Sequence, residues 1–297
     1  MPAISANKPT PLVKWVGGKR QLQVPILEKI LEVFDPHKGT YFEPFFGGGA
    51  IFFALNPAQA KASDINHGLV NLYNQVISTP ALVKEEALKF ELEYNLLSGQ
   101  AQSDYYLAKR KEFNTRVDSE FLNRLGVRGA ALFLFLNKAG FNGMYRENAS
   151  GEFNIPFGKR DKIKLFEELN LDAASGALAR LTINRMQYSE TVRDAKEGDL
   201  VYFDPPYAPL SSTSSFESYN SENLGGFDQV ALRDLVVELT NRRVHCLVSN
   251  SSAPIIEELY KDFNLVPLNA SRAISASADG RKKVKEYLID NFKQVQG

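Results

Sequence analysis

The sequence has very little of the chemistry that builds disulfides or metal centres. Its 297 residues include one cysteine, Cys246, so an intrachain disulfide and a site with several cysteine ligands are both excluded. The three histidines, His37, His67 and His245, are scattered along the chain, which disfavours a histidine-based metal site. We therefore expect no metal, a reducing cytoplasmic setting, and a place for Cys246 in the core rather than a role as a nucleophile.

Long apolar runs and an overall charge are also missing. No apolar run approaches membrane-spanning length, and the first ten residues contain no signal-peptide hydrophobic region, so we expect a cytoplasmic protein. The formal net charge is zero, which argues weakly against a nucleic-acid partner. Residues 101–164 nevertheless contain twelve Lys and Arg against seven Asp and Glu, a local excess of +5. Such a segment fits either a solvated helical face or a polyanion site.

Strand-like and helix-like segments alternate along much of the chain. Apolar runs that end in polar or turn residues predict seven strands, at residues 40–45, 60–64, 180–185, 199–204, 243–250, 264–270 and 286–292. The alternation predicts an α/β fold, with a seven-stranded, mostly parallel sheet and helices on both faces. Only a polar loop separates the last two runs, which favours an antiparallel final pair.

A mostly helix-like stretch interrupts this alternation and ends in the turn-rich FNGMYRENASGEFNIPFGKR, residues 141–160. The chain length suits one large α/β domain with an insertion. We predict a catalytic and cofactor-binding domain formed by residues 1–78 and 179–297, and an inserted, mainly helical domain with a β-hairpin at residues 79–178.

Three glycines follow a strand end in FEPFFGGGA, residues 42–50, and a helix starts directly after them. Glycine lets a nucleotide-like ligand approach backbone amides that a Cβ would block. The alternative is a purely structural turn. The next strand ends at Asp64, where a carboxylate accepts hydrogen bonds from ribose hydroxyls in nucleotide-binding sheets; the alternative is a helix cap. Together the two features favour an adenosine-containing cofactor.

The only tryptophan stands in KWVGGKR, residues 14–20, among two glycines and three cations. Trp15 is either a core anchor or one wall of a ligand site. Lys19 is a candidate charge partner for a ligand or for a nearby carboxylate.

The stretch VYFDPPYAPL ends a buried strand at Asp204 and continues with Pro205, Pro206 and Tyr207. The prolines donate no hydrogen bond and stiffen the turn. No histidine, cysteine or serine stands beside the motif in a nucleophile–base arrangement. A carboxylate and a rigid carbonyl can instead accept both hydrogens of a planar exocyclic amine, which makes its lone pair nucleophilic. The tyrosine offers a face for a base removed from its helix. The motif predicts methylation of an amine.

The chain resembles the Dam-like N6-adenine DNA methyltransferases, in the alpha group, where the cofactor motif precedes the recognition insert and the catalytic motif follows it. The resemblance is carried, in this order, by KWVGGK, FEPFFGGGA, SDIN, FNGMYRENASGEFNIPFGKR and DPPYAPLSSTSSF. DPPY alone is shared with other amino-methylating enzymes, whereas its combination with FNGMYR and FNIPFG is much more specific. The resemblance implies S-adenosyl-L-methionine as methyl donor, S-adenosyl-L-homocysteine as product, and adenine in double-stranded DNA as acceptor.

The resemblance also implies roles for individual residues. The catalytic positions would be Asp204, Pro205, Pro206 and Tyr207, with Phe216 beside the tyrosine in the base pocket. The positions that contact the cofactor would be Trp15, Lys19, Glu43, Pro44, Phe45, Gly47, Gly49, Asp64, Ile65 and Asp204.

The same resemblance assigns DNA contacts to the FNGMYR hairpin and its surroundings. Phe141 and Asn142 would fill the space left by a flipped base, and Arg146 would read a guanine edge. The remaining base contacts would come from Met144 and Pro156, at a thymine methyl, and from Lys14, at another guanine. Phosphate contacts would come from Arg116, Lys138, Asn148, Asn154 and Lys159. The usual target of the family makes GATC the expected site.

Several alternatives stay open at this point. The same chemistry could act on another DNA sequence, on RNA adenine or on a protein glutamine. A DNA-binding regulator without catalysis is disfavoured by the intact motifs, and a dinucleotide oxidoreductase leaves DPPY unexplained. We expect a monomer in solution. The sequence does not distinguish a solitary enzyme from one partnered by a restriction endonuclease that acts on the same site.

Overall fold

The structure is a computed structural model, and it describes residues 9–19, 21–117, 125–166, 170–209, 227–270 and 284–296. The chain divides into two compact units, each with its own internal packing. The first unit comprises the described parts of Met1–Gly18, Gly47–Asn56 and Asp64–Arg185. The second unit comprises the described parts of Lys19–Phe46, Pro57–Ser63 and Met186–Gly297. No helix within the described ranges is long and apolar enough to cross a membrane.

A seven-stranded sheet has the strand order β3-β2-β1-β4-β5-β7-β6. Its strands are β1 (Tyr41–Glu43), β2 (Ala60–Ser63), β3 (Leu181–Asn184), β4 (Leu200–Phe203), β5 (His245–Ser251), β6 (Asn264–Ala270) and β7 (Val284–Asp290). β1 pairs in parallel with β2 and β4, and β4 pairs in parallel with β5. β7 is antiparallel to both β5 and β6. The mostly parallel α/β sheet and its antiparallel final pair are confirmed.

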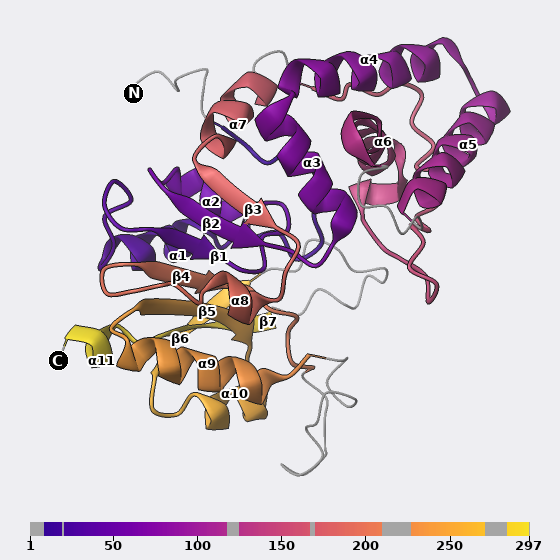
Figure 1. Cartoon of the computed structure of the whole chain (residues 1–297). Helices are drawn as coiled ribbons and strands as arrows, with labels where there is room; N and C mark the ends of the chain where they lie inside the picture. Colours follow the sequence, from indigo (N-terminus) through magenta and orange to yellow (C-terminus); the bar gives the residue numbers. More distant parts are fainter. Residues whose placement is uncertain are drawn as a thin grey trace, which may run out of the picture. The chain divides into compact units, whose positions relative to one another are not determined.

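The core of the second unit forms where apolar strands meet amphipathic helices. Its helices are α1 (Gln23–Leu31), α8 (Tyr188–Thr191), α9 (Gln229–Asn241), α10 (Pro254–Leu259) and α11 (Phe292–Gln296). The Asp228 carboxylate caps α9 by accepting hydrogen bonds from the Val230 and Ala231 amides. Leu232, Val236 and Leu239 lie at helical spacing on one side of α9, which packs against β5 (Figure 1). Cys246 belongs to this core, and burial raises the pKa of its thiol.

The strand order reverses between β1 and β4, because the chain places β2 on one side of β1 and β4 on the other. The carboxyl ends of these parallel strands lie at the same edge of the sheet. Glu43 ends β1 and Asp204 follows β4 directly, so both belong to that edge. In open α/β sheets, ligands bind outside the carboxyl ends of the strands at such a reversal.

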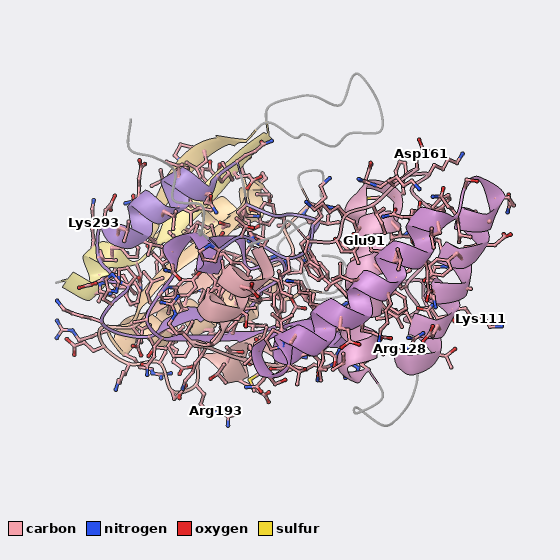
Figure 2. All side chains as sticks on the ribbon, turned by 90° about the horizontal axis from the view of Figure 1, so that it is seen from above. Glu91, Lys111, Arg128, Asp161, Arg193 and Lys293 are labelled. Carbon is pink, nitrogen blue, oxygen red and sulfur yellow. The ribbon has the colours of Figure 1, made fainter. Side chains whose placement is uncertain are left out.

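The first unit is mainly helical. Its helices are α2 (Ala50–Leu55), α3 (His67–Ser78), α4 (Pro80–Leu96), α5 (Gln100–Val117), α6 (Gly126–Ala139) and α7 (Asn170–Leu178), with a 3-10 turn η2 (Phe141–Gly143). α6 is apolar on nearly every side and buried among α3, α4 and α5 (Figure 1). The Arg128 guanidinium on α6 pairs with Glu86 of α4 and Glu112 of α5, and Lys111 extends outward from α5 (Figure 2). Part of the basic charge of residues 101–164 is therefore neutralised inside the unit.

A hairpin follows η2. The Asn148 amide donates to the Glu152 carbonyl at 2.9 Å, and the Asn154 amide donates to the Arg146 carbonyl at 3.0 Å. Helix α5 anchors the return strand, because the Tyr106 hydroxyl and the Arg110 guanidinium both donate to the Ile155 carbonyl at 3.0 Å. The hairpin is therefore held by the helices beneath it. The assignment of residues 79–178 to a separate recognition domain stays a prediction.

Candidate active site

Asp204 and Lys19 form an ion pair in the second unit. The Lys19 Nζ lies 2.8 Å from the Asp204 Oδ1, and only 9% and 21% of the two side chains are exposed. Burial raises the pKa of the Asp204 carboxyl, and the positive charge of Lys19 opposes this rise. The structure thus brings Lys19 and Asp204 together, although each was predicted from a different sequence motif.

The two prolines after Asp204 present their carbonyls differently. The Pro206 carbonyl accepts a hydrogen bond of 2.8 Å from the Gln229 side-chain amide, which is itself held by Asn250 at 2.9 Å. Within the described ranges, the Pro205 carbonyl accepts no hydrogen bond. The turn is therefore fixed from one side while the Pro205 oxygen stays available as an acceptor next to the Asp204 carboxylate.

Tyr207 is held from two directions. Its hydroxyl donates to the Glu286 carboxylate of β7 at 2.7 Å, and the Lys19 Nζ lies 4.6 Å from its ring centroid. Burial and the neighbouring carboxylates raise the pKa of Tyr207, so the hydroxyl stays protonated and remains a donor. Glu286 was missed by the sequence analysis, because no local motif links it to a turn that lies 79 residues earlier.

Replacing Glu286 by alanine should lower the rate of the methyl transfer that the resemblance implies by about tenfold to a hundredfold, because the Tyr207 ring loses the acceptor that fixes its plane. Glu286→Gln keeps an oxygen acceptor and should restore most of the rate. Single-turnover rates at saturating DNA and cofactor would measure both. Equal rates for wild type and Glu286→Ala would show that the hydrogen bond does not position the ring.

Three predicted cofactor residues, at the end of β1 and directly after it, lie at the edge of the sheet where the parallel strands end. Glu43 is buried and accepts a hydrogen bond of 2.9 Å from the Tyr41 hydroxyl, and the Pro44 carbonyl accepts one of 3.0 Å from Ser63. The Phe45 ring stacks on Tyr188, with centroids 5.3 Å apart. Phe227 meets the same ring edge-on at 5.5 Å. These two aromatic neighbours were also missed, since they come from distant segments.

In the first unit, Asp64 organises the glycine loop. Its two carboxylate oxygens accept hydrogen bonds from the Gly47 amide at 2.9 Å and from the Asn66 amide at 2.8 Å. Burial raises the pKa of Asp64, and these backbone donors oppose the rise. The side chain that caps α3 is Asn66, which accepts from the Leu69 amide, so Asp64 is not the helix cap.

The two predicted glycines have left-handed backbones, with φ of +48° at Gly47 and +66° at Gly49, the residue that precedes α2. A Cβ on Gly47 would lie 2.6 Å from the Trp15 Cδ1, so the tryptophan packs directly on this loop. Trp15 is therefore both a packing anchor and a wall of the loop. Ile65, next to Asp64, is 69% exposed.

Several predicted DNA contacts lie together in the first unit. The Lys14 Nζ donates to the Asn142 carbonyl at 3.4 Å. The buried Asn137, which the sequence analysis missed, bonds to the Lys14 backbone and also donates to the Gly143 carbonyl at 2.9 Å. Phe141 is 48% exposed.

The hairpin pairs further predicted residues. The Phe141 amide donates to the Pro156 carbonyl at 2.9 Å, and the Met144 amide donates to the Phe141 carbonyl at 3.3 Å. The exposed Arg146 donates from Nε to the Asn154 side chain at 2.8 Å.

Apart from Asn154, the predicted phosphate contacts come from several separate segments of the first unit. Lys138 is on α6, Asn148 is in the hairpin turn and Lys159 lies after the hairpin; all three are exposed. Arg116 lies on α5, with its side chain outside the described structure, and Phe216 lies outside the described residues. Among the described residues, no cluster of three His, Cys, Asp or Glu could hold a metal ion.

Comparison with known proteins decides the family. The family model for D12 class N6 adenine-specific DNA methyltransferases matches residues 15–274. The chain belongs to this family. The methyltransferase is 37% identical over 285 residues to a Type II methyltransferase of Lactococcus lactis subsp. cremoris, covering 95% of each chain. It is 34% identical over 290 residues to a Type II methyltransferase of Methanocaldococcus jannaschii, covering 95% of this chain and 99% of the relative.

A DNA adenine methylase of Vibrio cholerae is 34% identical to the methyltransferase over 283 residues, which cover 95% of this chain and 96% of the relative. The resemblance found in the motifs is thereby confirmed, and so is the expectation of an enzyme that methylates adenine in DNA. The alternatives of RNA adenine, protein glutamine, a non-catalytic regulator and an oxidoreductase lose their support.

Proposed function

We propose that the methyltransferase moves the methyl group of S-adenosyl-L-methionine to N6 of a flipped adenine within GATC in duplex DNA. The observation that carries this proposal is the turn after β4, where Asp204 pairs with Lys19 and the carbonyl of the next residue, Pro205, accepts no hydrogen bond from the described residues. These two acceptors suit the two hydrogens of one exocyclic amine. The Tyr207 ring, fixed by Glu286 and Lys19, offers a stacking face for the base.

The residues present fit an adenosine-containing methyl donor. The Asp64 oxygens accept backbone hydrogen bonds from Gly47 and Asn66, and a carboxylate has about four acceptor positions, which leaves room for a ribose hydroxyl. Gly47 lets the Trp15 ring pack directly against the loop, because a Cβ there would lie 2.6 Å from the Trp15 Cδ1. The cofactor contacts would come from Trp15, Lys19, Glu43, Pro44, Phe45, Gly47, Gly49, Asp64, Ile65 and Asp204. When bound, S-adenosyl-L-methionine supplies an electrophilic methyl group on a sulfonium ion.

The chain contributes positioning rather than a strong base. Asp204 and the Pro205 carbonyl hold the amine so that its lone pair leaves the ring conjugation and faces the methyl group. The nitrogen gains the methyl group and loses one proton, to water or transiently to Asp204. Because the groups are fixed before the base arrives, most of the acceleration comes from proximity and exclusion of water.

Sequence recognition is assigned to the first unit. Arg146 would read a guanine edge, Phe141 and Asn142 would enter the space left by the adenine, and Lys14 would contact a second guanine. The thymine methyl would contact Met144 and Pro156, and phosphates would contact Arg116, Lys138, Asn148, Asn154 and Lys159. We propose a cytoplasmic monomer that associates with the nucleoid when bound to DNA, with a restriction endonuclease of the same site as a possible partner.

Methyl incorporation into short duplexes tests this function. A duplex with one GATC should accept methyl groups only when S-adenosyl-L-methionine is present. Duplexes with one base pair of the site changed, and an RNA of the same sequence, should accept far fewer. Equal incorporation into all duplexes would contradict the GATC assignment.

Replacing Arg146 by alanine should relax discrimination at one guanine by about 1–3 kcal/mol, because a guanidinium fork matches the two major-groove acceptors of guanine. The measurement is kcat/KM on GATC and on duplexes with that guanine replaced. Arg160→Ala removes another exposed arginine from the same segment and is the matched control. A uniform loss on every duplex would make Arg146 a phosphate contact instead.

A further inference from the structure

We propose that Tyr145 and Glu147 are positioning residues that couple binding of the cognate DNA at the hairpin to binding of the cofactor at the Gly47 loop. The inference rests on the proposed function, because it takes the hairpin as a DNA contact and Gly47 with Asp64 as cofactor contacts. All the contacts that carry it lie within the first unit.

An aromatic stack forms the first connection. The Tyr145 ring stacks on both Trp15 and Phe133, with both centroids 5.3 Å away and interplanar angles of 25° and 21°. The Trp15 and Phe133 centroids are 6.3 Å apart, so the three rings form one cluster. Trp15 in turn packs against Gly47 so closely that no Cβ would fit. A displacement of Tyr145 therefore changes the support of the glycine loop through a single intervening ring.

A chain of hydrogen bonds forms the second connection. The Glu147 Oε1 accepts from the Tyr145 hydroxyl at 2.6 Å and from the Asn66 side-chain amide at 3.2 Å. The Asn66 backbone amide donates to Asp64, whose other oxygen accepts from the Gly47 amide. Burial and the Glu147 carboxylate raise the pKa of Tyr145, so its hydroxyl remains a donor.

The register of the hairpin explains why these two residues would report on DNA. Arg146, the predicted guanine reader, lies between Tyr145 and Glu147 in the sequence and is exposed. Glu147 forms an isolated antiparallel bridge with Phe153, and successive side chains of such extended backbone point to opposite sides. When Arg146 is fixed on a base, the backbone that carries Tyr145 and Glu147 is fixed as well. Cognate DNA should therefore tighten binding of the cofactor at the Gly47 loop. By thermodynamic linkage, the cofactor should tighten binding of cognate DNA by the same factor.

Calorimetry on the full chain tests the coupling. The probe is S-adenosyl-L-homocysteine, titrated without DNA, with a duplex containing one GATC, and with a duplex of scrambled site. In the wild-type protein the GATC duplex should tighten binding by about 5- to 150-fold, the usual range for coupled sites. Glu147→Ala should bring this ratio close to one while binding without DNA stays little changed.

Three further variants distinguish a specific loss of coupling from a general loss of folding or of binding. Glu152→Ala removes a carboxylate from the same hairpin, where it bonds to Asn148, and should keep the wild-type ratio. Glu147→Gln keeps an oxygen acceptor and should restore much of the ratio. Tyr145→Phe keeps the stack but removes the hydroxyl, and should lower the ratio even if Glu147→Ala folds poorly.

The outcomes distinguish this inference from the proposed function. A wild-type ratio of one, or a wild-type ratio retained in both Glu147→Ala and Tyr145→Phe, overturns the coupling while leaving the enzyme assignment intact. A wild-type protein that binds no S-adenosyl-L-homocysteine at all contradicts the proposed cofactor and removes the basis of the inference.

Discussion

Replacing Asp204 by asparagine should lower the rate of methyl transfer on the order of a thousandfold, because the negative charge that strengthens the preorganised acceptor is lost and one of its two oxygens becomes an NH2 donor facing the target amine. The substitution keeps the size of the side chain, so the fold should survive. Asp204→Ala should be at least as damaging. Single-turnover methylation of a GATC duplex would measure the loss, with thermal unfolding as the check on folding.

Asp194→Asn is the matched control, since Asp194 also pairs with a lysine, Lys61, but at the surface of the second unit. It should keep wild-type turnover. If Asp204→Asn turned over at a near-normal rate, the assignment of the acceptor would be wrong.

The pH profile checks the same role of Asp204. Burial raises its pKa, so the carboxylate is lost at a higher pH than for an ordinary aspartate, and the rate should fall as pH falls through that raised value. Lys19 lowers this pKa by its charge, so Lys19→Met should move the acid limb of the profile to still higher pH. The position of the limb, rather than the maximum rate, is the relevant readout.

Replacing Gly47 by alanine should weaken cofactor binding by about tenfold to a hundredfold. The added Cβ would lie 2.6 Å from Trp15, and the backbone has a φ of +48° that side chains rarely adopt. Overpacking of this kind costs about 1–3 kcal/mol, and each 1.4 kcal/mol is about tenfold in affinity. Titration with S-adenosyl-L-homocysteine would measure the change.

Gly99→Ala separates backbone strain from the collision with Trp15. Gly99 has a φ of +56°, but a Cβ there would meet nothing within 4 Å. The Gly99→Ala variant should lose some stability and keep the wild-type affinity for the cofactor. Similar affinities for the two variants would show that Trp15 and the glycine loop do not form the cofactor site.

The sheet was predictable because each of its strands is a short apolar run with clear ends. β4 and β5 are buried almost throughout, as continuous apolar runs such as LVYF predict. Helix α6 was likewise predictable from its central apolar run AALFLFL. The local motifs located Asp204, Gly47 and Asp64 because each belongs to a turn with a distinctive composition.

The partners that hold those residues were not predictable. Glu286 contacts Tyr207 across 79 residues of sequence, and Asn137 contacts Lys14 across 123. A lone glutamate in a strand or an asparagine in an apolar helix carries no local signal for such a contact. The helix cap is a smaller example, because Asp64 and Asn66 are both good capping residues and only the geometry shows that Asn66 caps α3.

The most direct test of the central claim is the chemical position of the methyl group. A duplex with a single GATC is incubated with the protein and S-adenosyl-L-methionine, digested to nucleosides, and analysed by mass spectrometry, with a parallel reaction of Asp204→Asn. The account predicts N6-methyladenine at the adenine of GATC, and almost none with Asp204→Asn. A methyl group on another base, or equal N6-methyladenine from both proteins, would contradict it.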